Sequence, residues 1–139
     1  MKSFIVATAI LMATAGAVAQ DSHAGHDHGA EHAHGEHHDL GTTTVANVKL
    51  EAAQLGKLTE KEGIFEITLA KGTPQPKAVR VWVGAESAEG SVKAKADGSN
   101  GVYEVHVEMP NPLPKNAKMW VEIQSADGKK AKASFALKK

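Results

Sequence analysis

The chain has no cysteine among its 139 residues. Disulfide bonds and thiolate metal sites are therefore excluded, and any metal ion would need nitrogen, oxygen or thioether ligands. Lysine and arginine are absent between Asp21 and Asp39, a segment that contains five acids, whereas the chain from Leu40 onward has an excess of lysine and arginine. An acidic segment beside a mildly basic domain argues against nucleic acid as a partner, because phosphate binding needs a concentrated basic surface.

Long apolar runs are absent except at the N-terminus, where residues 4–19 are almost all small or apolar. We predict a signal peptide over residues 1–19: Lys2 supplies the positive charge, the run is short for a membrane span, and Ala17 and Ala19 suit signal peptidase. Without a cysteine for lipid attachment, no membrane anchor is expected after cleavage, and the location is expected to be periplasmic or secreted. Loss of Gln20 as well would leave Asp21-Ser22-His23 at the N-terminus, which can bind Cu(II) or Ni(II) in a square plane.

Residues 20–41 are predicted to form a disordered arm. The segment is rich in glycine, acids and histidine, and it has too few apolar side chains to offset the entropy of ordering it. Seven of the eight histidines of the chain lie here: His23, His26, His28, His32, His34, His37 and His38.

The spacing of these histidines predicts metal binding by the arm. Imidazole is a good ligand for Zn(II), Cu(II) and Ni(II), and closely spaced histidines let a flexible chain offer two nitrogens to one ion. Asp27, Glu36 and Asp39 are weaker candidates that would add oxygen ligands. A loose site of this kind buffers ions and does not catalyse, and no nucleophile–base pair or phosphate-binding loop is evident, so the chain is not expected to be an enzyme. The alternative is a solubilising or pH-responsive tail.

Residues 42–139 are predicted to form one all-β domain, a seven-stranded antiparallel β-sandwich of the immunoglobulin or fibronectin type. Short alternating runs are separated by Gly, Pro, Asn and Asp. The expected strands are 43–51, 62–70, 77–84, 90–96, 101–108, 117–124 and 130–137. The connection 52–61 is expected to be polar, with room for a helical turn.

Alternation within these strands predicts one apolar inner face and places Trp82, Trp120 and His106 on outer faces. If the third and sixth strands are neighbours, the two tryptophans stand side by side and form a candidate partner surface. The alternative is that a bulge turns them inward or that Arg80 covers them. His106 lies between Glu104 and Glu108 along one strand, a row that could bind a metal weakly, although most such rows are solvated strand faces.

The leader, the HDH/HAH/HGEHH arm and the segments KAVRVWVG and MPNPLPKNAKMWVEI together resemble the small exported YtkA-like or FixH-like immunoglobulin-sandwich proteins. The resemblance covers residues 42–139 and implies a periplasmic accessory protein of heavy-metal efflux, with no catalytic residue carried over. The implied partner is a membrane metal-efflux transporter or its periplasmic adaptor. The leading hypothesis is therefore buffering of Zn(II), Cu(II) or Ni(II) by the arm, and the rival is an envelope protein–protein interaction module.

Overall fold

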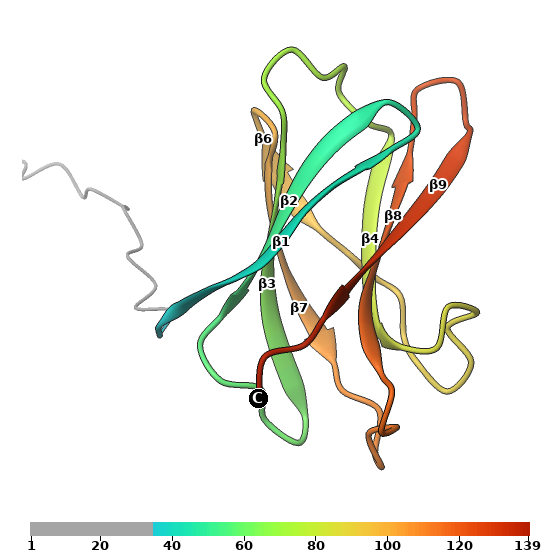
Figure 1. Ribbon diagram of the computed structural model, residues 1–139. Coiled ribbons are helices and arrows are strands. Elements are labelled where there is room, and N and C mark those ends of the chain that lie inside the picture. Colours follow the sequence, from blue (N-terminus) through green and yellow to red (C-terminus); the bar gives the residue numbers. More distant parts are fainter. Residues whose placement is uncertain (1–34) are drawn as a thin grey trace, which may run out of the picture. The chain divides into compact units, whose positions relative to one another are not determined.

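Nine strands form two antiparallel sheets in the computed structural model, which describes residues 35–139 (Figure 1). The strands are β1 (His37–Val45), β2 (Val48–Leu55), β3 (Glu62–Leu69), β4 (Ala78–Gly84), β5 (Ala94–Lys95), β6 (Asp97–Ser99), β7 (Val102–Glu108), β8 (Lys118–Gln124) and β9 (Lys130–Ala136). The predicted all-β sandwich is confirmed, with nine strands in place of seven. Residues 35–139 contain no helix with the length and apolar character that a membrane crossing requires.

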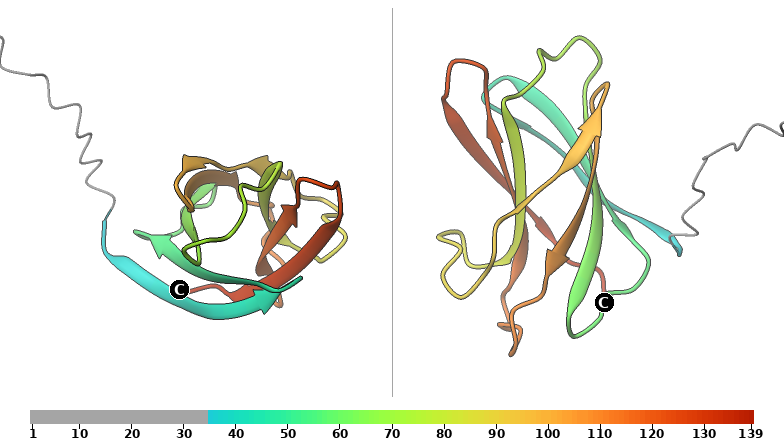
Figure 2. Two further views of the ribbon diagram at one scale, coloured as in Figure 1. Left: turned by 90° about the horizontal axis from the view of Figure 1, so that it is seen from above. Right: turned by 180° about the vertical axis from the view of Figure 1, so that it is seen from behind.

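The two sheets face each other across one core (Figure 2). The five-stranded sheet has the order β1-β2-β3-β7-β6, and the four-stranded sheet has the order β5-β4-β8-β9. The predicted pairing of the strands that carry Trp82 and Trp120 is confirmed, because β4 and β8 are antiparallel neighbours.

The core is built from the alternate side chains that the sequence pattern predicts. Its buried members are Leu50, Ala52, Phe65, Ile67, Leu69, Val79, Val81, Val83, Ala96, Tyr103, Val105, Val107, Met109, Met119, Val121, Ile123 and Phe135. Period-two alternation therefore found most of the core, since every second side chain of a strand points to the same side. Ala52, Ala96 and Met109 were missed because they lie at or beyond the ends of the predicted strands.

The first predicted strand is wrong in its bounds, because residues 43–51 contain the turn of a hairpin. Ala46 and Asn47 both have positive φ, at 48° and 63°, as a two-residue turn between twisted strands requires. The connection 52–61, in which a helical turn was possible, holds none: β2 continues to Leu55, and residues 56–61 contain no helix. β1 begins at His37, so the last five residues assigned to the arm, 37–41, belong to the sheet.

The predicted strand over residues 90–96 is reduced to the two residues of β5. The segment between β4 and β5 instead folds back over the outer side of the four-stranded sheet, where the Ser91 hydroxyl donates a hydrogen bond to the Val83 carbonyl at 2.6 Å. Gly84 permits this approach: it has a φ of 136°, and a Cβ there would lie 2.4 Å from Ser91 Oγ.

Candidate functional site

The histidines of the predicted arm divide between two parts of the chain. His23, His26, His28, His32 and His34 lie outside the residues that the structure describes, and so does Asp27. His37 and His38 lie within it, at the start of β1, and Glu36 directly precedes them.

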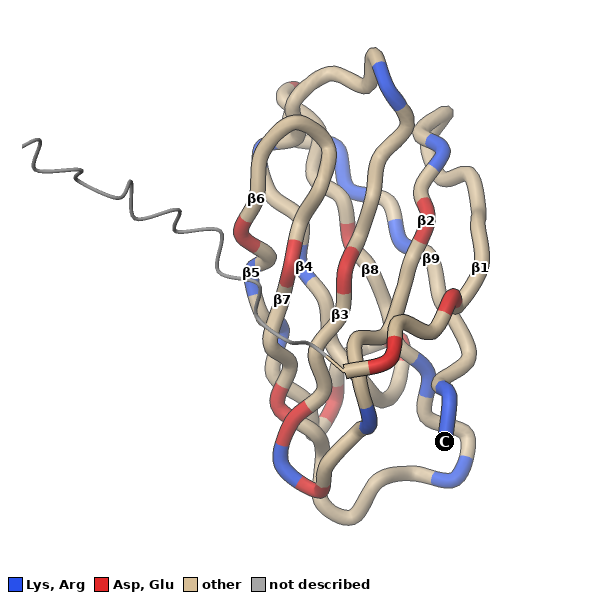
Figure 3. The backbone as a smooth tube through the Cα atoms, turned by 90° about the vertical axis from the view of Figure 1, so that its left-hand side faces the viewer, with Lys and Arg blue, Asp and Glu red and all other residues tan. Residues whose placement is uncertain are grey.

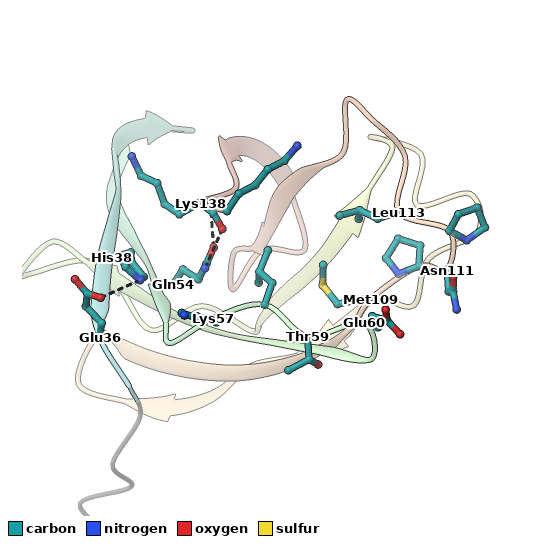
Figure 4. Close-up of a pocket in the computed structure, with 14 residues that line it drawn as sticks. Glu36, His38, Gln54, Lys57, Thr59, Glu60, Met109, Asn111, Leu113 and Lys138 are labelled. Atoms are coloured by element: carbon teal, nitrogen blue, oxygen red, sulfur yellow. Dashed lines mark hydrogen bonds and ion pairs between the residues drawn. The ribbon is translucent and has the colours of Figure 1, made fainter.

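His37 and His38 point to opposite faces of the five-stranded sheet, as adjacent residues of a strand must. On the outer face, His37 Nε2 lies 3.8 Å from Glu66 Oε1. On the other face, His38 Nε2 lies 4.0 Å from Glu36 Oε2 (Figure 4). While β1 is intact, the two rings cannot turn to one ion, so each is restricted to ligands on its own side.

A hollow of about 230 Å³ on the outer face lies beside His37. Its titratable lining consists of His37, Asp39, Glu51 and Glu66, and Ala53 contributes the small side chain that leaves the space open. Asp39 also accepts a hydrogen bond from the Gly41 amide at 2.7 Å, where the ladder of β1 and β2 has a bulge. The hollow is rich in carboxylates, yet His37 and Glu66 are 3.8 Å apart and do not form a tight pair.

His106 lies between two carboxylates, of which Glu104 belongs to the predicted row, whereas Glu62 of the neighbouring strand takes the place predicted for Glu108. Its Nδ1 contacts the Glu62 carboxylate on β3, and its Nε2 lies 3.5 Å from Glu104 Oε1 on β7. The two carboxylates contact different nitrogens of the ring, so the imidazole lies between Glu62 and Glu104. A metal ion bound to one nitrogen could not reach both acids, and the row is an ion-pair bridge across two strands.

Across residues 35–139, no group of three histidine or carboxylate side chains is arranged to hold a metal ion. His106 and the weaker candidates Glu36 and Asp39 thus belong to no such group in this part of the chain. The metal hypothesis depends on the five histidines that precede Gly35.

A groove of about 860 Å³ opens between the ends of β1 and β2, the loop after β7 and the end of the chain (Figure 4). Its lining is Glu36, His38, Gln54, Lys57, Leu58, Thr59, Glu60, Met109, Pro110, Asn111, Pro112, Leu113, Lys138 and Lys139. Gln54 is 2% exposed and holds this end of the sandwich together, because its amide makes two hydrogen bonds with the backbone of Lys138. No local pattern of residues could indicate this groove, since its walls come from four separate segments.

Trp82 and Trp120 pair directly across β4 and β8 and stack with ring centroids 6.3 Å apart and an interplanar angle of 13°. Their adjacency was predicted correctly. Whether the rings are exposed as a partner surface or hidden was left open, and Trp82 is hidden, at 0% exposed. Its cover is not the bulge or the Arg80 side chain that the alternative named. Trp82 stays on the outer face and is covered by the β4–β5 segment: its Nε1 donates to Ala85 O at 2.7 Å, and Lys93 Nζ lies 4.4 Å above its ring.

Glu122 is a buried carboxylate beside this pair, surrounded by cations. Its Oε2 lies 3.1 Å from Lys93 Nζ, and its Oε1 lies 4.0 Å from Arg80 and 3.9 Å from Lys130. One acid therefore faces three basic groups, which leaves an excess of positive charge on the outer side of the four-stranded sheet. The Trp pair beneath is a structural feature with little area free for a partner.

The chain matches no family model, no curated protein and no solved structure. The resemblance to the YtkA-like or FixH-like proteins therefore stays a prediction from the sequence segments that carry it.

Proposed function

We propose that the chain binds Zn(II), Cu(II) or Ni(II) through the histidines that precede the sandwich, as an exported buffer or capture protein for these ions. The observation that carries this proposal is the density of imidazole: five of the eight histidines of the chain lie within the twelve residues 23–34, ahead of the first strand. Carboxylates are interleaved with them, which attracts cations and adds oxygen ligands.

The role proposed for the sandwich is to carry the arm and to dock it on a partner. A membrane metal-efflux transporter or its periplasmic adaptor is the partner class that the sequence resemblance implies. Tethering ligands to a docked domain raises the local concentration of captured ions at the partner, because the second encounter becomes intramolecular. No chemistry beyond capture and release is required of the chain.

Calorimetric titration with Zn(II), Ni(II) and Cu(II) at neutral pH tests the proposal. Truncation at Gly41 would remove half of β1 and confuse loss of ligands with loss of fold, so substitution is the better design. In the test variant, asparagine replaces His23, His26, His28, His32 and His34. In the control, asparagine replaces His37, His38 and His106.

We expect the test variant to lose most of the metal capacity and the control to keep most of it, because the described histidines belong to no three-ligand group. Equal uptake by the unaltered chain and the test variant would overturn the proposal. The function to pursue would then be the rival one, a protein–protein interaction module of the envelope.

A further inference from the structure

The outer faces of the two sheets carry opposite charge. The strands of the five-stranded sheet contain seven acids and one lysine, whereas those of the four-stranded sheet contain five basic residues and one acid. We call the first the acidic face, formed by Asp39, Glu51, Glu62, Glu66, Asp97, Glu104 and Glu108. We call the second the basic face, formed by Arg80, Lys95, Lys118, Lys130 and Lys132.

The acids lie opposite one another on neighbouring strands. Glu66 pairs with Glu104, Glu104 pairs with Asp97, and Glu62 pairs with Glu108. Like charges in directly opposed positions destabilise a sheet. His106, between Glu62 and Glu104, and His37, beside Glu66, offset part of this repulsion. Figure 3 shows acidic positions on each of the neighbouring strands β2, β3, β7 and β6. Such a face gains stability when cationic groups cover it.

The basic face has the matching arrangement. Lys95, Arg80, Glu122 and Lys132 form one register row across β5, β4, β8 and β9. The acid of this row is buried, so the row presents cations outward, and one of them, Lys132, also contacts Glu86 of the β4–β5 segment at 3.5 Å. Neighbouring strands lie about 4.8 Å apart in every sheet. The acids of one sheet and the cations of another therefore have the same spacing from strand to strand and can be matched one to one.

From this complementarity we propose that the acidic face of one molecule docks on the basic face of a second copy of the chain. The two faces lie on opposite sides of the sandwich, so each docked molecule still presents one free face of each sign. The contact is heterologous and allows stacking beyond two copies. The association is electrostatic and independent of the metal proposal.

Sedimentation velocity of the chain from Gln20 onward, which keeps every described residue, tests this proposal. The buffer contains EDTA, so that metal ions cannot bridge two arms. We expect association at 10 mM salt that weakens at least about tenfold by 300 mM salt, because salt screens exposed charges. A monomer at 10 mM salt at all concentrations would overturn the proposal.

Two double variants test whether both faces take part in the contact between copies. Lys95→Glu with Lys132→Glu alters the basic face, and Glu51→Lys with Glu108→Lys alters the acidic face; all four side chains are exposed. Each variant alone should remain monomeric at 10 mM salt. Their equimolar mixture should form a dimer that does not grow further, because one native acidic face and one native basic face remain.

A matched control changes the net charge without touching either face. Lys71→Glu with Lys115→Glu alters two exposed loop residues and should associate like the unaltered chain. Loss of association in this control would mean that net charge, and not the faces, governs the effect. Association of the acidic-face variant by itself, or failure of the mixture to dimerise, would also overturn the proposal. Circular dichroism of each variant verifies the fold.

Discussion

Gln54 and Lys138 are joined by a pair of reciprocal hydrogen bonds, although 84 residues separate them in the sequence. Gln54 Nε2 donates to Lys138 O at 3.1 Å, and the Lys138 amide donates to Gln54 Oε1 at 3.2 Å. The chain after β9 has its backbone bonded to this side-chain amide, in the way that it would otherwise bond to the backbone of a neighbouring strand. Because Gln54 is buried, water cannot replace these bonds.

Gln54→Ala should lower the free energy of unfolding by about 2 to 3 kcal/mol, since it removes a buried amide that makes three hydrogen bonds, two with the Lys138 backbone and one with Gly56 O. Urea denaturation followed by circular dichroism measures this loss. Gln75→Ala is the matched control: Gln75 is exposed and donates one bond, to the Tyr103 hydroxyl, so its loss should cost less than about 1 kcal/mol. Equal costs for the two variants would contradict this role of Gln54.

The two tryptophans should differ in their accessibility to solvent. The Trp120→Phe chain retains the fully buried Trp82, and its fluorescence should be shifted to shorter wavelength and weakly quenched by acrylamide. The Trp82→Phe chain retains the half-buried Trp120 and should be quenched more strongly. Equal quenching constants would show that the β4–β5 segment does not cover Trp82 in solution.

Glu122→Gln should destabilise the fold by about 1 to 2 kcal/mol, because it removes the one negative charge among three cations. This loss of unfolding free energy is smaller than for a fully buried ion pair, since the basic partners are 33–54% exposed. Glu86→Gln is the control, because the ion pair between Glu86 and Lys132 is exposed and should contribute less than about 0.5 kcal/mol. Thermal unfolding at low salt compares the two; a larger loss for Glu86→Gln would refute the argument.

The pKa of Asp127 is held below its ordinary value, chiefly because the Ser125 hydroxyl donates to its carboxylate and then because the Lys129 amide does so. A pKa that is lower in the folded state contributes stability above the ordinary pKa, and this contribution is lost as the pH falls through the folded value. Ser125→Ala should therefore raise the pKa of Asp127 toward that of a free aspartate. NMR titration of the side-chain carboxyl carbon measures the change, and an unaltered pKa would rule out Ser125 as the main cause.

The sequence predicted the strands that have one face in the core but failed at β2, where both faces are covered. The alternation of Phe65, Ile67 and Leu69 identifies an inner face directly. In β2 it breaks down, because Ala52, Ala53, Gln54 and Leu55 are all buried, and a polar amide among them resembles a solvent-facing residue. Burial of Gln54 depends on a partner 84 residues away, which local pattern cannot indicate.

Of the candidate site, the sequence predicted the pairing of Trp82 with Trp120 but not its cover, which comes from loop geometry around Gly84 and Ser91. The bridge from His106 to Glu62 was missed because it crosses from one strand to another. The acidic face, by contrast, left a readable signal in the sequence. Its acids are separated by an even number of residues within a strand, as Glu104 and Glu108 are. Side chains with this spacing point to the same side of a sheet.

The position of β1 at the border of its sheet has a mechanical consequence. β1 is bonded to β2 alone, and the pair of His37 with Leu55 is the outermost rung of that ladder. Tension applied through Gly35 would peel the ladder rung by rung from this end. The first side chains set loose would be His37 and His38, while the opposing sheet keeps its own ladder of bonds. A binding event on the predicted arm that pulls on Gly35 would thus free two further imidazoles before the sandwich opens.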